Sequence, residues 1–350
     1  MKVIDLTTRT QALHVRLDPS PVYDLLAAMY VAENWTPERG FEVDRRWIRR
    51  ARNSLGPALR KDLWLFARER GLIMGLVSLL EQRPGISVRE FIKTVASAPP
   101  PDLVERILTA PRAARPTASL LRDAMRLRHE AAVKAFLAAY PKEFGRTRVR
   151  EVVSTDAGEV RDRLVGLLRG FYEKVYVQEE ALVLPLLHTD LRAKEALAEV
   201  MPAAELVERA TGGFTIGPDS GITQVVLAPS YFFRPYNLMS EYPGVRVFIY
   251  PLDLTGDQPT SPARLLARLF KALGDETRLR ILQMLAEREM YLQEIANRLG
   301  VTHVTAIHHL ALLRAARLVR VVERGNLKYY HLRREMAAEV GTRVKQWLQV

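Results

Sequence analysis

Hydrophobic and polar positions repeat with a helical period through most of the first 210 residues. Apolar residues that recur every three or four positions predict amphipathic helices. One helix is expected to begin at Ser20-Pro21, because proline suits the first helical turn. The same period occurs in three longer stretches, which are residues 45–70 with a break at Gly56-Pro57, residues 119–139, and residues 160–200 with a break near Pro185. The pattern predicts a mainly helical amino-terminal domain.

The pattern changes after Gly212, where short runs replace the long periodic stretches. Residues 223–227, 231–233 and 245–250 are rich in Val, Ile, Phe and Tyr and are separated by Gly, Pro and Asn, which predicts strands. These aromatic side chains could line an apolar ligand pocket, or they could form the core of a small sheet, which is the interpretation we favour. The cluster consists of Tyr231, Phe232, Phe233, Tyr236, Tyr242, Phe248 and Tyr250.

Residues 254–261 contain Gly, Pro, Thr and Ser without any periodicity, which is typical of a linker. The chain is therefore expected to divide into two domains. Residues 1–253 would form a mostly helical domain with a β-rich end, and this domain would bind an effector or mediate dimerisation. Residues 262–350 would form the second domain.

The second domain shows the order of elements of a winged helix-turn-helix. Helices are expected at residues 263–273, 276–285, 292–299 and 302–316, with Asp275 and Thr302 as amino-terminal caps and Gly300 in the tight turn. Two β-rich runs then flank Arg324-Gly325-Asn326 and predict a hairpin, before a closing helix at 334–348. The predicted fold class is thus mainly α with small β elements, in which a helical domain with a short β-rich layer precedes a carboxy-terminal winged helix-turn-helix.

The positive charge is concentrated in this second domain. The chain has a net charge of +12, and residues 262–350 contain 16 basic and 8 acidic residues, against 36 and 32 in the first 261. A basic bias on a small domain favours binding to phosphates and hence to double-stranded DNA. The alternative is a solvated surface that is merely rich in arginine.

Several motifs in the second domain carry a family resemblance. They are Leu273-Gly-Asp-Glu-Thr-Arg-Leu-Arg-Ile-Leu282, Glu294-Ile-Ala, Leu299-Gly, His308-His-Leu310, Leu313-Arg314 and the wing at 325–330. Residues 262–333 strongly resemble ArsR-type winged helix-turn-helix regulators. The resemblance implies a sequence-specific transcriptional regulator, of the repressor type, that binds palindromic operators as a homodimer. The expected pairing surfaces are the helices at 263–273 and 334–348, with Trp347 and Leu348 as apolar anchors.

The sequence departs from this family where metal-sensing members bind their ions. The third helix lacks the cysteine pair of many such members, since the chain contains no cysteine, and residues 334–350 contain no histidine. We therefore predict no metal and no cofactor, and any effector would be an unidentified small molecule. The long region ahead of the module resembles the uncharacterised region found there in some relatives, which implies no chemistry.

The helical phase of residues 302–316 predicts which side chains meet DNA. If Ala306, Leu310 and Leu313 face the domain core, the opposite side enters the major groove and the wing reaches the phosphates. The predicted DNA-binding residues are Thr302, His303, Val304, Thr305, Ile307, His308, Arg314, Arg324, Asn326 and Lys328.

Catalytic motifs are not apparent in the sequence. It lacks the glycine-rich phosphate loop, the dinucleotide-binding glycines and His-Glu-x-x-His, and the pair His188 and Asp190 is more typical of a structural role than of a base and its orienter. The chain is expected not to be an enzyme, and to be cytoplasmic, since no signal peptide or membrane span is visible. Two alternatives stay open, namely an enzyme or ligand-binding domain fused to a DNA-binding module and an architectural protein without sequence preference.

Overall fold

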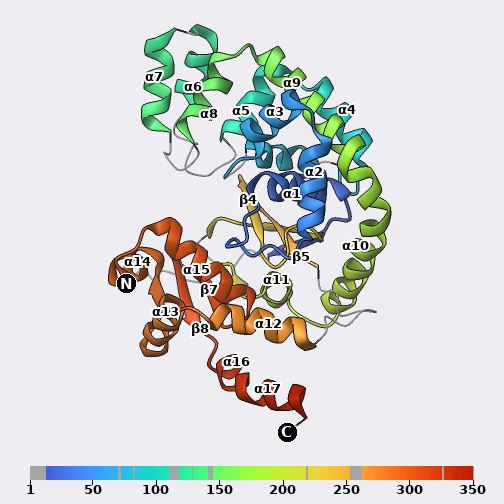
Figure 1. Cartoon of the computed structure of the whole chain (residues 1–350). Coiled ribbons are helices and arrows are strands. Elements are labelled where there is room, and N and C mark those ends of the chain that lie inside the picture. Colours follow the sequence, from blue (N-terminus) through green and yellow to red (C-terminus); the bar gives the residue numbers. More distant parts are fainter. Residues whose placement is uncertain are drawn as a thin grey trace, which may run out of the picture.

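The computed structural model describes residues 13–69, 72–81, 83–109, 118–127, 129–140, 145–217, 220–252, 262–324 and 327–349 (Figure 1). Helices dominate, and two small four-stranded sheets complete the fold, so the predicted fold class is confirmed. The predicted linker at 254–261 lies outside the described residues. Below, "the amino-terminal region" means residues 13–252 and "the winged helix" means residues 262–349.

The first sheet has the strand order β1-β3-β5-β4 and lies at the side of the amino-terminal region that faces the winged helix (Figure 1). Strands β1 (His14–Leu17), β3 (Gln224–Ser230) and β5 (Val245–Pro251) are parallel, and β4 (Leu238–Tyr242) is antiparallel at the edge. Almost every residue of β3 and β5 is buried, as expected for strands that are covered on both faces. The predicted strands at 223–227 and 245–250 are thereby confirmed.

The third predicted strand, residues 231–233, is wrong, because these residues form a turn after β3. The carboxylate of Asp24 accepts hydrogen bonds from the backbone amides of Tyr231 and Phe232, at 2.8 and 3.1 Å. Amides that are held by a side chain are not available to a strand ladder. The aromatic cluster itself packs into the protein core, which confirms the interpretation that we favoured.

Helix α1 (Pro21–Asn34) is the central helix and contacts β3, β5 and α3. It is buried on nearly every face, which explains why it is apolar all round rather than on one stripe. It begins at Pro21, as predicted, and the side chain of Ser20 caps it. The remaining helical elements of the amino-terminal region are α2 (Arg45–Ser54), α3 (Pro57–Ala67), η1 (Leu72–Leu80), α4 (Val88–Ser97), α5 (Pro100–Thr109), α6 (Ala118–Leu127), α7 (Glu130–Ala139), α8 (Arg146–Ser154), α9 (Ala157–Phe171), η4 (Tyr172–Tyr176), α10 (Val177–Ala198) and α11 (Ala203–Thr211).

The break predicted near Pro185 is also wrong. Helix α10 continues through Pro185, and the irregularity is instead the π-helical turn η4, which joins α9 to α10. A proline leaves the carbonyl four residues earlier without its partner. Here Pro185 and Ala181 are both exposed, so water can hydrate that carbonyl and the helix survives.

The winged helix has the predicted order of elements. The side chain of Asp275 accepts from the Arg278 amide, that of Thr302 accepts from the Thr305 amide, and Gly300 ends α14 in the left-handed conformation. Its elements are α12 (Pro262–Leu273), α13 (Glu276–Glu287), β6 (Met290–Tyr291), α14 (Leu292–Leu299), α15 (His303–Ala315), β7 (Val319–Arg324), β8 (Leu327–Leu332), α16 (Arg334–Ala338) and α17 (Val340–Leu348). The predicted closing helix is thus two helices, which extend away from the rest of the chain (Figure 1).

A short strand from the amino-terminal region joins the sheet of the winged helix. Strand β2 (Phe214–Thr215) pairs in parallel with β7, and the sheet order is β2-β7-β8-β6. One hydrophobic cluster therefore contains side chains of both parts, including Phe214, Phe248 and Val321. The winged helix is docked on the amino-terminal region. Residues of the amino-terminal region therefore lie beside α15.

Candidate nucleic-acid interface

The helix-turn-helix formed by α14 and α15 has the orientation that its sequence predicts. Ala306, Leu310 and Leu313 are buried, the last two within the core of the winged helix. Arg278 joins α13 to the end of α12 within the same module. Its guanidinium donates to the carbonyls of Ala272 and Lys271, each at 2.6 Å. The opposite side of α15 is thereby set to face outward from the winged helix.

The first turn of α15 is open to solvent. Thr302, His303 and Thr305 are exposed, and the apolar side chain of Ile307 is 36% exposed. These residues lie at the end of the recognition helix that enters the major groove in helix-turn-helix proteins. The side chain of Val304 and the whole of Asn326 lie outside the described residues.

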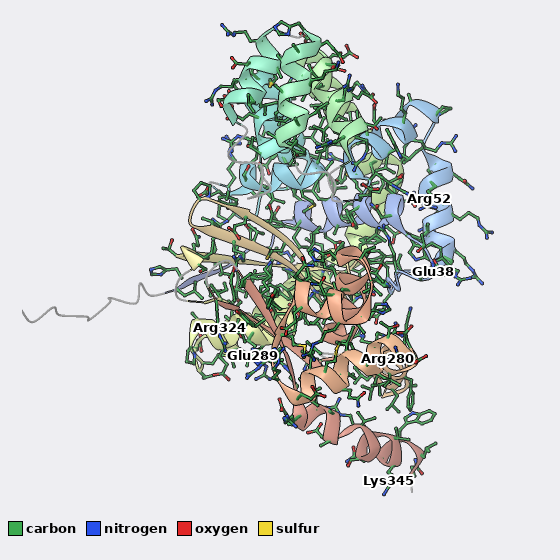
Figure 2. The ribbon with its side chains drawn as sticks, turned by 90° about the vertical axis from the view of Figure 1, so that its left-hand side faces the viewer. Glu38, Arg52, Arg280, Glu289, Arg324 and Lys345 are labelled. Carbon is green, nitrogen blue, oxygen red and sulfur yellow. The ribbon has the colours of Figure 1, made fainter. Side chains whose placement is uncertain are left out.

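Arg324 provides an exposed positive charge at the end of the hairpin formed by β7 and β8. Its guanidinium is paired with Glu289, with one contact at 3.0 Å, and lies 5.2 Å from the centre of the Tyr329 ring. Figure 2 shows the two charged side chains beside one another on the surface of the winged helix. An exposed ion pair of this kind contributes little stability and is readily exchanged for a phosphate.

His308 is half-buried and faces the amino-terminal region rather than open solvent. The backbone of Glu38 and the side chain of Arg39 lie near its imidazole. Burial, followed by the neighbouring His309, lowers the pKa of His308, so its neutral form is favoured. The structure thus places His308 apart from the exposed first turn.

Arg314 and Lys328, both predicted to contact DNA, point instead into the junction with the amino-terminal region. The Arg314 guanidinium donates to the carbonyl of Thr211 at 3.1 Å. The Arg314 guanidinium carbon and the Lys328 ammonium lie 5.8 and 5.3 Å from the centre of the Phe214 ring. Burial lowers the pKa of both groups. The expectation that they lie on the DNA-facing surface is corrected, because the amino-terminal region covers the positions that helical phase left open.

Burial of Lys328 predicts a measurable dependence of stability on pH. Burial lowers its pKa from 10.5 to about 8, so between these values the unfolded chain holds a proton that the folded protein has released. The free energy of unfolding should therefore rise with pH across this window, by about 1.5 kcal/mol from pH 7.5 to 9.5. Urea unfolding at both pH values measures the rise, and Lys328→Met should abolish it. An equal rise in the two proteins would contradict the prediction.

A buried ion-pair network joins the first sheet to the wing, and nothing in the local sequence indicates it. Arg246 of β5 is 1% exposed and donates to Glu323 of β7 at 3.1 Å and to Glu241 of β4 at 2.7 Å. Glu323 lies far from the other two residues in sequence, and each of the three alone is typical of an exposed strand position. The network fixes the position of β7, and hence of the hairpin, relative to the amino-terminal region.

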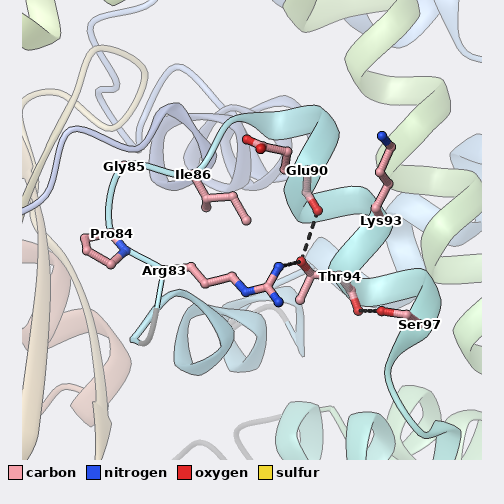
Figure 3. A pocket seen from close by; sticks show the side chains of 8 residues that line it. All are labelled: Arg83, Pro84, Gly85, Ile86, Glu90, Lys93, Thr94 and Ser97. Carbon is pink, nitrogen blue, oxygen red and sulfur yellow. Dashed lines mark hydrogen bonds between the residues drawn. The ribbon is translucent and has the colours of Figure 1, made fainter.

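A surface hollow of about 590 Å³ lies between α4 and the loop that precedes it (Figure 3). Arg83 donates to the Thr94 hydroxyl at 3.2 Å, and Thr94 donates to the Glu90 carbonyl at 3.0 Å. The polar groups around this hollow thus bond largely to one another. No described residue of the hollow belongs to α15 or to the hairpin.

His188 and Asp190 do not converge on a common site. Both lie on α10, but His188 is exposed, whereas Asp190 is buried and bonds to Lys194 and Tyr250. Among the described residues, no three His, Asp or Glu side chains are grouped as metal ligands would be. No helix in the described part of the chain is long and apolar enough to cross a membrane.

The fold and the exposed end of α15 define a winged helix-turn-helix protein. Residues 275–321 match the family model of the bacterial regulatory proteins of the arsR family. A relative from Methanocaldococcus jannaschii, the uncharacterized HTH-type transcriptional regulator MJ1325, is 36% identical over 75 residues, which are 21% of this chain and 84% of the relative. The chain therefore belongs to the ArsR family, and its carboxy-terminal part is a DNA-binding module for transcriptional regulation.

Two further relatives match the same part of the chain. The HTH-type transcriptional regulator KmtR of Mycobacterium tuberculosis is 39% identical over 77 residues, which are 22% of this chain and 59% of KmtR. The transcriptional repressor SmtB homolog of a Synechocystis species is 36% identical over 70 residues, which are 20% of this chain and 53% of that protein. The chain thus spans little more than half the length of these two relatives.

Proposed function

We propose that this protein is a cytoplasmic, sequence-specific transcriptional repressor that binds palindromic operators as a homodimer. The observation that carries the proposal is the open first turn of α15, where Thr302, His303, Thr305 and Ile307 are exposed at the end of a complete helix-turn-helix. Hydroxyl and imidazole groups can bond to base edges, and an isoleucine can contact a thymine methyl group. The name of the Synechocystis relative supports the repressor assignment.

The homodimer is supported by exposed apolar side chains on the two helices that the sequence singled out. Phe270 of α12 and Trp347 of α17 are each 50% exposed, and Leu265 and Leu348 are exposed as well. Helices α12 and α17 contact one another, so these side chains belong to neighbouring elements. Two winged helices joined here would bind half-sites about one turn of DNA apart. The proposal gives residues 1–253 a role in dimerisation or effector binding, not in catalysis.

The decisive experiment selects genomic DNA fragments with the purified full-length protein. A palindromic consensus with two half-sites supports a dimeric, sequence-specific regulator. Enrichment without a consensus would support the architectural alternative, and no enrichment would contradict DNA binding. The mass of the complex on a selected fragment, measured by light scattering, gives the number of chains bound.

Two substitutions should separate base reading from phosphate contact. Ile307→Ser should change the base preferred at one position of each half-site, because it removes the apolar contact with a thymine methyl. Arg324→Ala should instead weaken binding to all fragments by a similar factor and lower the salt dependence by about one ion per chain. Competition binding against a library of single-base variants, at several salt concentrations, measures both effects.

Arg280→Ala is the matched control for this pair. Arg280 is an exposed arginine on α13 that pairs with Glu276 within one helix, at a distance from Arg324 in the molecule (Figure 2). It should affect neither the consensus nor the salt dependence. If Ile307→Ser leaves the consensus unchanged, or if Arg324→Ala behaves like Arg280→Ala, the assignment of that residue is wrong.

A further inference from the structure

The outward side of α15 is covered by the amino-terminal region beyond its second turn. Ala311, Leu312 and Ala315 pack against the amino-terminal core, and Arg314 is bonded to Thr211. These positions lie on the side of the helix that is turned away from the core of the winged helix. Among the described side chains on this side of α15, those of the first turn and of Ile307 remain open.

This covering leaves insufficient space for DNA along α15. An α-helix with its side chains is about 10–12 Å wide, and the major groove is about 12 Å wide. A helix must therefore be free of other protein along the length that enters the groove. Because the backbone of Glu38 lies near His308, the wall of the groove would collide with the loop that carries Glu38.

Hydrogen bonds and ion pairs hold the winged helix in this position, beside the apolar contacts of Leu312 and Val321. The Val321 amide of β7 donates to the Gly213 carbonyl at 2.7 Å, and ion pairs join Arg333 to Glu208 and Arg268 to Glu42, at 2.8 and 2.7 Å. Junctions within a chain that rest on such contacts resemble transient interfaces, which open and close. Water can take over these hydrogen bonds when the two parts separate.

The junction also holds two cations that lack an anionic partner of their own. Among the described residues, no carboxylate lies within ion-pair distance of Arg314 or Lys328. The nearest acids that act on Lys328, Glu323 and Glu241, are both engaged by Arg246. A half-buried charge without a partner is unfavourable. Opening would present both cations to solvent, where DNA phosphates can pair with them.

We propose that the docked arrangement is an autoinhibited state, in which the amino-terminal region and DNA compete for the same side of α15 and for Arg314 and Lys328. This inference rests on the proposed DNA binding by α15. The apparent affinity for DNA is then the affinity of the open state multiplied by the fraction of open molecules. Any change that favours opening raises the affinity, and any change that prevents opening lowers it.

The first test opens the junction with a single methyl group. A β-carbon at Gly217 would overlap the Glu323 carbonyl of β7, so Gly217→Ala should push the two parts away from one another. The matched control is Gly166→Ala, because Gly166 of α9 has no atom near the position of its β-carbon. Gly217→Ala should accelerate amide hydrogen exchange in β7 and tighten binding to a selected fragment about ten-fold. Gly166→Ala should change neither quantity.

The second test holds the junction closed in the full-length chain. The protein contains no cysteine, so Glu42→Cys and Arg268→Cys together create one pair that a short, reducible bismaleimide can join across the junction. The linked protein should bind the fragment at least ten-fold more weakly than the same variant without the linker. Reduction of the linker should restore the affinity.

The outcomes separate this inference from the proposed function. Equal binding by the linked and unlinked proteins would overturn the inference, and so would faster exchange in Gly217→Ala without tighter binding. If Gly217→Ala leaves amide exchange in β7 unchanged, the substitution has not opened the junction. The comparison of linked and unlinked protein then decides whether the inference holds. If no form of the protein binds any fragment, the proposed function fails instead, whatever the junction does.

Discussion

Asp24→Ala is expected to lower the free energy of unfolding by at least about 4 kcal/mol, a large share of the total stability of a protein. Asp24 is fully buried in α1, and its carboxylate accepts four hydrogen bonds. The donors are the Ser230 hydroxyl, the amides of Tyr231 and Phe232, and the Tyr176 hydroxyl. Each donor that loses its acceptor in the interior costs about 1–3 kcal/mol.

The four donors of these hydrogen bonds come from parts of the chain that are distant from Asp24 in sequence. They come from the end of β3 and from the π-helical turn η4, so Asp24 joins the central helix to the sheet and to the α9–α10 connection. Burial raises the pKa of Asp24, and the hydrogen bonds oppose that rise. Asp24 thus stabilises the turn at residues 231–233, which the sequence analysis predicted as a strand.

Urea unfolding followed by circular dichroism measures this effect. The matched control is Asp44→Ala, since Asp44 is an exposed cap of α2 that accepts from one amide, that of Arg46. Loss of such a cap typically costs about 1 kcal/mol. If Asp24→Ala costs no more than Asp44→Ala, the four bonds do not have the structural role that their geometry indicates.

The winged helix was predictable from sequence because its signals are local. The caps Asp275 and Thr302, the left-handed Gly300 and the helical spacing of apolar residues each act within a few positions. Several such signals agree along about seventy residues, so the order of elements follows almost without tertiary information. The same reasoning correctly assigned the buried side of α15.

The amino-terminal region was harder to predict, because its sheet depends on contacts that are distant in sequence. His14 of β1 pairs with Gln224 of β3, and the two-residue strand β2 exists only because β7 lies beside it. Strands this short have no periodicity to detect. Asp24, likewise, is an ordinary helical residue until the fold brings Tyr231 against it.

The candidate site shows the same limit. The helical spacing of apolar residues predicts which side chains point away from the core of the winged helix, and Arg314 is one of them. It cannot state what another part of the chain places there, and here Thr211 and Phe214 occupy that side. The observed surroundings of Arg314, which differ from the open surface that the sequence predicts, are therefore the observation from which autoinhibition is inferred.

Arg246→Met should lower the free energy of unfolding by about 3–5 kcal/mol. The substitution keeps the approximate length of the side chain but leaves the buried Glu323 and the half-buried Glu241 without the cation that they share. The cost comes from the loss of the cation beside two carboxylates in the interior rather than from lost packing. Because the network joins β5 to β7, amide hydrogen exchange in β7 should accelerate before the protein unfolds as a whole.

A second variant separates charge from packing. When Glu323→Leu and Glu241→Leu are added to Arg246→Met, no buried charge remains in the network, and apolar groups of similar size fill the space. Replacement of a complete buried ion network in this way is often neutral or stabilising, so most of the lost stability should return. If the triple variant is no more stable than Arg246→Met alone, the geometry of the arginine, and not its charge, holds the wing against the amino-terminal sheet. Both unfolding measurements use urea at neutral pH, where the carboxylates are ionised in the unfolded chain.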